Sequence, residues 1–410
     1  MKKFTKILCV LLGTVMLSMP FAACADKGKT EGDQKPPVVV DPEPKPEPHP
    51  DPKPDPEPEP QPDPVNGVTL LFPKKESTVS IANELITKFS ENYVENSSEQ
   101  IIPLDKKGTD VYASAGLILK WTSAEKVENF TLTLSTDAGF KAENTMTYQT
   151  AETQMLIPDL TVSTQYYWNV CAADKPELKS ETYSFTTAQT PRTIFIDGVS
   201  NTRDIGGYLA EGGERIRQGV VYRGGLPDSV SAQGITQATE KYGIRTELDL
   251  RDNNDGKSNS FGSGVKYVRN HLSPYYVSVN SGSIGIDVAA NYAALKKELL
   301  IFADSLNFPV YFHCSLGRDK TGTLSLILLA LCGVSEQDIY MDYELSYFSQ
   351  AGSQGSTIVD RTFNAVRPTI EFLKSQGETL SLGCEKFLTG KVGLTAEQIS
   401  QIKGNLLVAD

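Results

Sequence analysis

The fold is decided by the stretch Phe308-Pro309-Val310-Tyr311-Phe312-His313-Cys314-Ser315-Leu316-Gly317-Arg318-Asp319-Lys320-Thr321-Gly322. Its first five residues form a short apolar run, which is consistent with a fully buried strand. The apolar segment Thr321–Leu331 predicts a helix that ends at Gly333. Strand, loop and helix in this order are typical of α/β folds, which place a ligand at the C-terminal end of a strand and the N-terminus of a helix.

The loop between this strand and this helix has the layout of an anion-binding site with a nucleophile at its base. Gly317 permits a tight turn, so that six successive backbone N–H groups can converge on one anion. The dipole of the following helix adds positive potential. A thiol at Cys314 would ionise readily at this focus and would be positioned for in-line attack on phosphorus. This chemistry requires no cofactor and no metal, and the spacing of the cysteines resembles neither a zinc site nor a dense disulfide framework.

The loop resembles the signature of cysteine-dependent protein tyrosine phosphatases, and the resemblance covers residues 191–410. The flanking segments resemble the opening and closing motifs of one bacterial and fungal branch of that family, which includes enzymes acting on phosphotyrosine, phosphoserine and phosphoinositides. The resemblance implies an α/β domain with a central, mostly parallel sheet. The motifs are Asn201-Thr202-Arg203-Asp204-Ile205-Gly206-Gly207, Tyr222-Arg223-Gly224-Gly225, Asp342-Tyr343-Glu344-Leu345-Ser346, Phe387-Leu388 and Gly393-Leu394-Thr395.

The resemblance assigns roles to the residues of the loop. Cys314 is the expected nucleophile, which would form a phosphocysteine intermediate. His313 would hydrogen-bond the loop, although a packed strand-end histidine describes nearly the same role. Thr321 would stabilise the thiolate through its hydroxyl. The residues expected to bind the substrate phosphate are Ser315, Leu316, Gly317, Arg318 and Thr321.

The loop departs from the family at Lys320, where the family places arginine six residues after the nucleophile. Arginine grips phosphate through a rigid bidentate fork, whereas lysine offers a point charge. Losing one charge-assisted hydrogen bond costs roughly 1.5–3 kcal/mol, which corresponds to a rate lower by about one to two orders of magnitude. Arg318 would compensate in part if its guanidinium swung over the phosphate. We predict a weakened enzyme with Lys320 in the arginine role, and a phosphate-binding pseudophosphatase as the alternative.

Two aspartates are candidates for the general acid that protonates the leaving oxygen. Asp319 lies in the loop itself and is the favoured candidate, because the resembling branch is thought to use an acid at this position. Its structural alternative is a carboxylate that pairs with Arg223 or Arg251. Asp287 lies 27 residues before Cys314 but is also expected to be the N-cap of a helix over Asp287–Leu306.

The N-terminus predicts export and lipid attachment. Lys2 and Lys3 precede an apolar run over Ile7–Phe21, as in a secretory signal. Phe21-Ala22-Ala23-Cys24 resembles a bacterial lipobox, in which Cys24 would be acylated. We therefore expect residues 1–24 to be a lipoprotein signal peptide, and acylated Cys24 to anchor the protein to the outer face of a bacterial membrane. Plain secretion is the alternative.

Residues 25–64 predict a disordered tether. The segment from Pro36 to Pro64 holds 14 of the 24 prolines in near-strict alternation, which excludes helices and ladders. Polyproline II geometry would let it span on the order of 90 Å. Eight acids against Lys45 and Lys53 give the segment a net charge of −6, half of the chain's −12, so the acidity says little about partners.

Residues 65–188 read as short strands with period-two alternation, for example Asn129–Ser135 and Gln165–Ala172. Leu160–Trp168 resembles the late-strand corner of a fibronectin type III sandwich, and Trp121 on an early strand fits that fold. Ala82–Tyr93 predicts an inserted helix. A spacer or protein-contact module is the expected role.

The predicted partners are a phosphorylated protein or phosphoinositide substrate and, through the anchor, a membrane; no nucleic-acid partner is expected. Rhodanese-like sulfur transfer also uses a cysteine loop, but the motifs at Asn201–Gly207 and Asp342–Ser346 argue against it. Turnover of a simple phosphate ester separates the enzyme from a surface module that only captures anions.

Overall fold

The computed structural model describes residues 67–95, 110–111, 116–252, 259–271, 284–353 and 365–409. All of these belong to one compact unit, Pro62–Asp410. The predicted signal peptide, Cys24 and the whole of the predicted tether lie outside the described residues.

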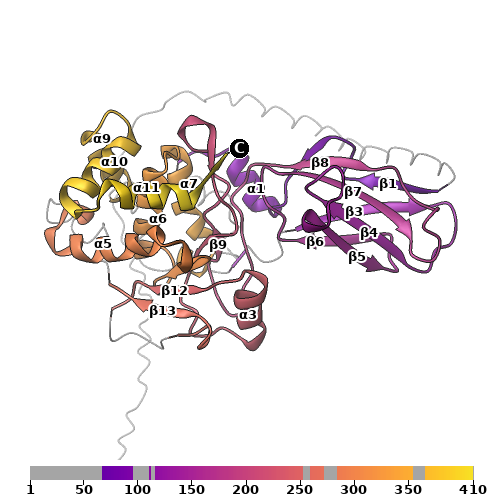
Figure 1. The fold of residues 1–410 in the computed structure, drawn as a ribbon, viewed down its shortest axis with the longest axis horizontal. Coiled ribbons are helices and arrows are strands. Elements are labelled where there is room, and N and C mark those ends of the chain that lie inside the picture. Colours follow the sequence, from indigo (N-terminus) through magenta and orange to yellow (C-terminus); the bar gives the residue numbers. More distant parts are fainter. Residues whose placement is uncertain are drawn as a thin grey trace, which may run out of the picture. The chain divides into compact units, whose positions relative to one another are not determined.

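The first part of the unit is built from two packed sheets, drawn in indigo to magenta in Figure 1. A three-stranded sheet has the order β1-β3-β6, and a five-stranded sheet has the order β2-β8-β7-β4-β5. Apolar side chains of both sheets share one core. The strands are β1 (Val68–Phe72), β2 (Ser77–Val79), β3 (Gly116–Ser123), β4 (Phe130–Ser135), β5 (Thr145–Thr150), β6 (Gln154–Pro158), β7 (Gln165–Ala172) and β8 (Tyr183–Thr187).

Aromatic residues mark the core of this sandwich. Trp121 on β3 and Trp168 on β7 are buried, as period-two alternation on half-buried strands requires. The Tyr166 hydroxyl accepts a hydrogen bond from the Thr161 amide at 3.0 Å, which is the geometry of a tyrosine corner. The two-sheet architecture is therefore present, and the assignment to the fibronectin type III family stays a prediction.

The second part contains a five-stranded sheet of order β13-β12-β14-β11-β9. Strands β13, β12, β14 and β11 pair in parallel, and β9 pairs antiparallel to β11. The predicted mostly parallel central sheet is confirmed. The strands are β9 (Arg203–Asp204), β11 (Val221–Gly224), β12 (Thr246–Asp249), β13 (Lys266–Arg269) and β14 (Val310–His313), and β10 (Glu214–Ile216) pairs with β15 (Leu407–Ala409) in a separate ribbon.

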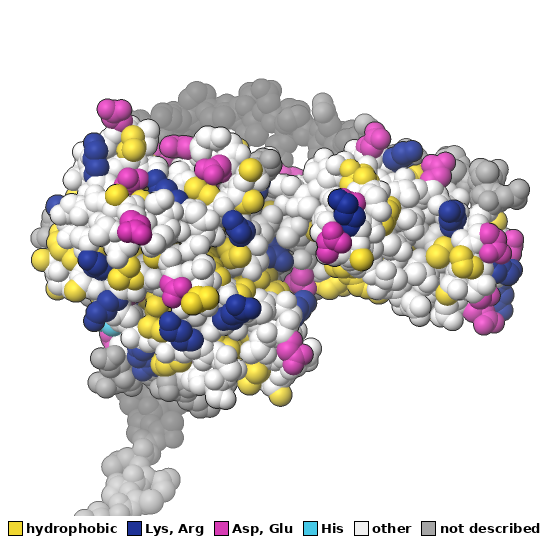
Figure 2. Space-filling view, in the orientation of Figure 1, with side chains coloured by type: hydrophobic (Ala, Val, Ile, Leu, Met, Phe, Trp, Pro, Cys, Tyr) yellow, Lys and Arg dark blue, Asp and Glu magenta, His cyan; other side chains and the backbone are white. Residues whose placement is uncertain are grey.

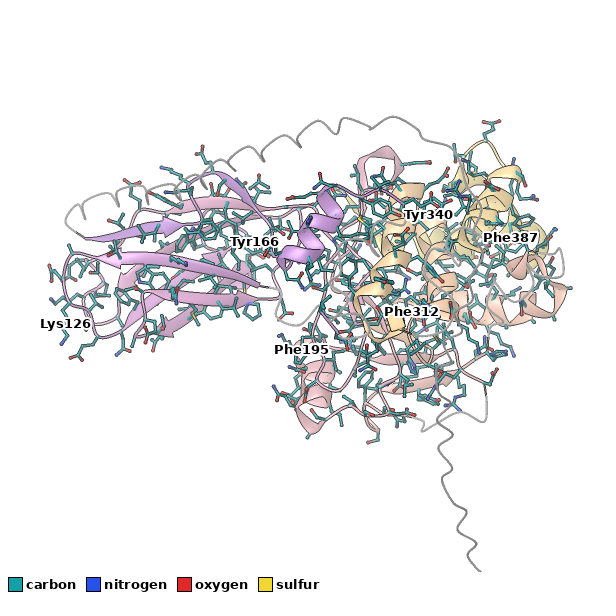
Figure 3. The ribbon with its side chains drawn as sticks, turned by 180° about the vertical axis from the view of Figure 1, so that it is seen from behind. Lys126, Tyr166, Phe195, Phe312, Tyr340 and Phe387 are labelled. Carbon is teal, nitrogen blue, oxygen red and sulfur yellow. The ribbon has the colours of Figure 1, made fainter. Side chains whose placement is uncertain are left out.

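The two faces of this sheet bury different side chains. Val310 and Phe312 of β14 pack into the larger core with the helices, whereas Tyr311 packs into a smaller core on the other face. Helix α6 is buried along almost its whole length, and Figure 3 shows Phe312 and Phe387 within this part of the molecule. The α-helices among the described residues of this part are α3 (Ala232–Thr236), α5 (Ala289–Ala303), α6 (Asp319–Leu331), α7 (Glu336–Glu344), α9 (Arg367–Ser375), α10 (Leu380–Phe387) and α11 (Ala396–Leu406).

Helix α1 (Glu84–Glu91) lies between strands β2 and β3 in sequence but packs with the second part. Its N-cap is Asn83, whose side chain accepts from the Ile86 amide. Ile86 and Phe89 are fully buried in the larger core, and the Phe89 ring lies 5.0 Å from that of Phe348. The predicted helix is present, and its apolar face belongs to the α/β part of the chain.

A loop of the sandwich is also hydrogen-bonded to the α/β part. The Gln218 side chain accepts from the Val162 amide at 2.8 Å and donates to the Val162 carbonyl at 3.0 Å. Arg192 donates to the Asp159 and Leu160 carbonyls. The sandwich and the α/β part therefore form a common interface, in which side chains of the α/β part bond to backbone groups of the sandwich loop. Positive and negative side chains are interspersed on the face shown in Figure 2.

Candidate active site

Cys314 lies directly after β14, the central strand of the parallel sheet, and α6 begins at Asp319. Both neighbours of β14 run parallel to it, so the loop Cys314–Arg318 emerges at the carboxyl edge of the sheet. The Cys314 thiol is free and 7% exposed. The predicted strand–loop–helix unit is thus present, and its helix begins two residues before the predicted start.

Three carbonyl oxygens of the loop accept hydrogen bonds from groups outside it. In a trans peptide the C=O of one residue and the N–H of the next point in opposite directions. The amides of the three following residues therefore point away from these outside donors. The bonds are Leu226 N to Ser315 O at 3.1 Å, Asn201 Nδ2 to Leu316 O at 2.9 Å and Arg223 Nη2 to Gly317 O at 2.8 Å.

Gly317 is required at its position for two reasons. Its φ is +70°, a left-handed conformation that residues with a Cβ rarely adopt. A Cβ on Gly317 would also lie 2.3 Å from the carbonyl group of Gly224. The tight turn predicted from the sequence is therefore present, and it lets the loop pack directly against the end of β11.

Asp342 on α7 ties the loop to the sheet through two fully buried arginines. It pairs with Arg223 and accepts from Arg203 Nε at 2.9 Å, while Ser325 donates to it from α6. Burial would raise the pKa of Asp342, but the Arg223 and Arg203 charges outweigh it and hold that pKa below its usual range. Arg223 is the residue that holds the Gly317 carbonyl, so the ion pair fixes the loop.

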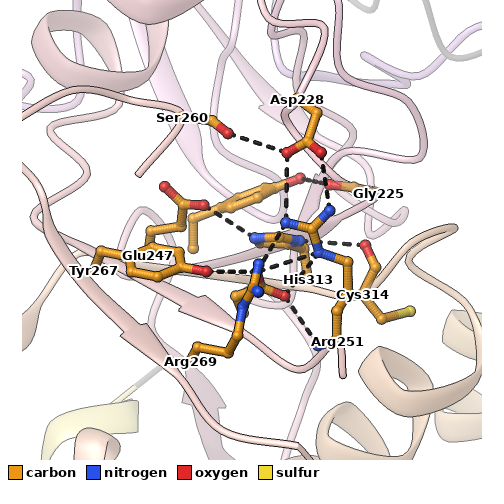
Figure 4. A network of polar contacts seen from close by, with 11 residues as sticks. Gly225, Asp228, Glu247, Arg251, Ser260, Tyr267, Arg269, His313 and Cys314 are labelled. Atoms are coloured by element: carbon orange, nitrogen blue, oxygen red, sulfur yellow. Dashed lines mark hydrogen bonds and ion pairs between the residues drawn. The ribbon is translucent and has the colours of Figure 1, made fainter. Parts of the chain in front are cut away.

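His313 joins the loop to a buried carboxyl group (Figure 4). Its Nδ1 lies 3.2 Å from the Cys314 carbonyl oxygen, and its Nε2 lies 3.1 Å from Glu247 Oε1; both side chains are fully buried. A carbonyl can only accept, so Nδ1 carries a hydrogen. For Nε2 and Glu247 Oε1 to form a hydrogen bond, one further hydrogen must lie between them. His313 thus links the Cys314 carbonyl to Glu247, and this contact positions the backbone of Cys314.

A second polar network holds the ends of β12 and β13 (Figure 4). Asp249 accepts from Arg251, Arg269 and Tyr267, and Arg251 also pairs with Asp228. Burial opposes the charge of Asp249, but hydrogen bonds from Arg251 and the nearby His313 prevail and hold its pKa well below the usual range. This network fixes the edge of the sheet beside the loop.

Lys320 contacts two residues that sequence reasoning did not single out. Its Nζ lies 2.8 Å from His271 Nδ1 and 3.5 Å from Asp252 Oδ1, and its side chain is 17% exposed. Asp252 and His271 follow β12 and β13, the strands beyond β14. The carboxyl ends of neighbouring parallel strands meet at one edge of a sheet. The position of Asp252 and His271 shortly after two strands was therefore the sequence feature that could have identified them.

Arg318 and Asp319 contact each other. Arg318 is 2% exposed and donates to the Ala351 carbonyl at 2.8 Å and to Asp319 Oδ1 at 3.3 Å. Asp319 also accepts from the Tyr343 hydroxyl at 3.2 Å. The arginines considered as structural partners of Asp319, Arg223 and Arg251, pair with other aspartates. The Arg318 guanidinium is directed toward Ala351 and Asp319.

The prediction that Asp287 caps a helix is wrong. The N-cap of α5 is Val288, which makes no side-chain cap, and Asp287 ends a 3₁₀ turn over Gly285–Asp287. Its carboxylate instead accepts from the Tyr292 hydroxyl at 2.6 Å and pairs with Lys391 at 2.7 Å. The Asp287 carboxylate is therefore engaged with Tyr292 and Lys391.

Thr321 lies in the first turn of α6 and is fully buried. Its hydroxyl has no hydrogen-bond partner among the described residues.

Over the described ranges there is no group of three His, Cys, Asp or Glu residues suited to a metal ion. Nor does any described helix have the length and apolar character needed to cross a bilayer.

A family model described as the tyrosine phosphatase family matches residues 194–408. A curated relative in Cupriavidus necator, named as a putative tyrosine-protein phosphatase, is 29% identical over 185 residues; the match covers 38% of this chain and 64% of that protein. Among solved structures, the core catalytic domain of the PP-IP phosphatase SIW14 from S. cerevisiae matches with a TM-score of 0.26 and 19% identity, over 38% of this chain and 86% of that one. PTPMT1 in complex with PI(5)P matches with a TM-score of 0.20 and 13% identity, over 34% of this chain and 94% of that one.

Proposed function

The chain belongs to the tyrosine phosphatase family, and we propose from this premise that it hydrolyses phosphate monoesters through a phosphocysteine intermediate. The observation that carries the proposal is the anchoring of three successive loop carbonyls by Leu226, Asn201 and Arg223. It turns the following amides to the opposite side, where they can surround an anion. Cys314, at the start of this loop, is the proposed nucleophile.

The proposed reaction has two balanced steps. The Cys314 thiolate attacks phosphorus, so that an S–P bond forms while the bond to the ester oxygen breaks, and the leaving oxygen takes a proton from Asp319. Water then attacks phosphorus, gives a proton to Asp319, and releases inorganic phosphate and the thiolate. The amides of the loop stabilise the charge on the equatorial oxygens in both steps. No metal or cofactor enters this scheme.

The surrounding residues have positioning or electrostatic roles in this proposal. Lys320 would supply positive charge to the phosphate in the place of the family's arginine, and Ser315 through Arg318 would bind oxygens through their amides. The buried Thr321 hydroxyl would donate to the thiolate, since it has no other partner among the described residues. His313 would hold the Cys314 carbonyl.

A phosphate-binding pseudophosphatase is the second candidate, and Lys320 is the observation that favours it. Its Nζ already contacts His271 and Asp252, so part of its charge is engaged at the sheet edge. Such a protein would capture phosphorylated ligands without turnover.

Turnover of p-nitrophenyl phosphate by reduced protein decides between the two candidates. We expect the unmodified protein to release nitrophenol and Cys314→Ser to release none above background. If the unmodified protein binds phosphate but shows no turnover at any pH, the protein is a pseudophosphatase and not an enzyme. Phosphotyrosine proteins are the proposed substrates, with phosphoserine proteins and phosphoinositides as further candidates to be compared in one panel.

We also propose that acylated Cys24 anchors the protein to the outer face of a bacterial membrane. The lipobox-like Phe21-Ala22-Ala23-Cys24 and the proline-rich segment behind it support this placement. Cys24→Ser should move the protein from the membrane fraction to the soluble exported fraction. A Cys24→Ser protein that stays in the membrane fraction would contradict lipid attachment at this residue.

A further inference from the structure

A cavity of about 460 Å³ lies beside the phosphate-binding loop, and the loop residues Ser315 and Leu316 form part of its wall. Its volume is in the range of pockets that hold small ligands. Much of the rest of the wall is apolar and includes Ile194, Ile196 and Leu226. A substrate whose phosphate lies in the loop would therefore have neighbouring groups next to this cavity.

Asp110 is the one charged residue among the described residues that line the cavity. It comes from outside the phosphatase domain, because it lies between β2 and β3 in the sequence. Its carboxylate accepts from Ser200 Oγ at 2.8 Å and from the Asn201 amide at 3.1 Å. Asn201 in turn holds the Leu316 carbonyl, so Asp110 is joined to the wall of the loop through one residue.

Val111, which follows Asp110, is hydrogen-bonded through both its amide and its carbonyl. The Val111 amide donates to the Phe348 carbonyl at 3.0 Å, and the Asn83 side chain donates to the Val111 carbonyl. Helix α1 buries Ile86 and Phe89 in the same core. These contacts hold the carboxylate in the cavity wall.

We propose that this cavity is a substrate-specificity site in which Asp110 recognises a lysine or arginine side chain next to the phosphorylated residue of a protein. This inference rests on the proposed phosphatase function and names its substrate class. The apolar wall suits the hydrocarbon stem of such a side chain, and the carboxylate suits its cationic end. A second phosphate of a polyphosphorylated headgroup would instead meet like charge.

The environment of Asp110 disfavours its ionised form in the absence of a cation. Burial raises the pKa of Asp110, and hydrogen bonds from Ser200 and Asn201 offset this only in part. A carboxylate partly withdrawn from water gains from a cation nearby, since the opposite charge favours its ionised form.

The test compares two phosphotyrosine peptides, one with lysine and one with glutamate beside the phosphorylated residue, as substrates of the full chain. In the unmodified protein we expect the lysine peptide to have the higher kcat/KM. Asp110→Asn keeps an oxygen to accept from Ser200 and Asn201 but removes the charge. It should lower the ratio of the two kcat/KM values by about tenfold to hundredfold, the factor for one charge-assisted hydrogen bond.

Asp137→Asn, the same change on the sandwich outside the cavity, is the matched control and should keep the unmodified ratio. An equal ratio in Asp110→Asn and the unmodified protein would overturn the proposal, as would a soluble phosphoinositide headgroup preferred over both peptides. Hydrolysis of p-nitrophenyl phosphate by the unmodified protein is measured in parallel. Its absence would instead overturn the phosphatase function itself.

Discussion

Lys320 is the residue at which the loop departs from the pattern of the family, which places arginine there. Its contacts with His271 and Asp252 place its charge at the carboxyl edge of the sheet, near the start of α6. A point charge there can attract a phosphate but cannot grip it with two parallel bonds. A family member with lysine at this position should therefore be slower than one with arginine.

Lys320→Arg should raise kcat/KM on p-nitrophenyl phosphate by about tenfold to hundredfold, because a bidentate contact with the phosphate is restored. Lys386→Arg, on the exposed side of α10, is the matched control and should change nothing. A Lys320→Arg protein that is inert while Cys314 is reduced would count against the enzyme.

The general acid can be identified by the leaving group. Asp319→Asn should strongly lower kcat for a phenyl phosphate whose leaving group is poor. It should lower kcat only slightly for p-nitrophenyl phosphate, because a good leaving group needs no proton. Asp287→Asn is the comparison, because Asp287 pairs with Lys391. If Asp287→Asn shows the leaving-group dependence and Asp319→Asn does not, the roles are reversed.

Alkylation should distinguish the cysteines. Burial raises the pKa of Cys332 to about 12 and also raises that of Cys384, so both thiols stay protonated and unreactive at neutral pH. Iodoacetate should modify Cys314, and inorganic phosphate should protect it. Cys171, which is partly exposed, is the internal control that phosphate should not protect. Equal protection of Cys171 and Cys314, read by peptide mass spectrometry, would argue against an anion site at the loop.

At the scale of elements, the sequence predicted the strand, loop and helix around Cys314 because each depends on local pattern and on one glycine. The contacts that hold the loop join residues far apart in the chain, such as Asn201 with Leu316 and Arg223 with Asp342. The motifs that contain these residues can be recognised in the sequence, but which residue of one motif contacts which residue of another depends on the three-dimensional fold. Asp287 was misassigned because a 3₁₀ turn precedes α5 and moves the cap position to Val288.

Asp342 should be the polar residue whose loss most destabilises this arrangement. Asp342→Asn leaves the buried Arg203 and Arg223 without their full counter-charge, which costs about 3–5 kcal/mol in comparable buried pairs. Urea denaturation should show this loss in the free energy of unfolding. Asp338→Asn, on the same helix but half-buried, should stay within about 0.5–1 kcal/mol of the unmodified protein. Equal effects of the two changes would mean that the ion pair does not hold the loop.

At the scale of the molecule, the phosphatase core includes a helix that the sequence assigned to the neighbouring sandwich. Periodicity located this helix, but it could not show which core its apolar face joins. Ile86 and Phe89 are fully buried among residues of the α/β part. The stretch from Pro191 onward is therefore not the whole folding unit of the phosphatase.

Phe89→Ala should lower the free energy of unfolding by about 3–5 kcal/mol and reduce phosphatase activity at elevated temperature, because it opens a cavity in that core. Val94→Ala, just after the same helix but 68% exposed, is the control and should have little effect. If Phe89→Ala melts only the sandwich and leaves the activity melting curve unchanged, α1 does not support the phosphatase core.

In the proposed reaction, the phosphoryl group passes through Cys314. Rapid mixing of reduced protein with p-nitrophenyl phosphate, followed by acid quench and peptide mass spectrometry, tests it directly. We predict one phosphoryl group on the peptide that contains Cys314 and none on that peptide in Cys314→Ser. Turnover by the Cys314→Ser protein at the unmodified rate, with no phosphoryl group on this peptide in either protein, would contradict the phosphocysteine mechanism.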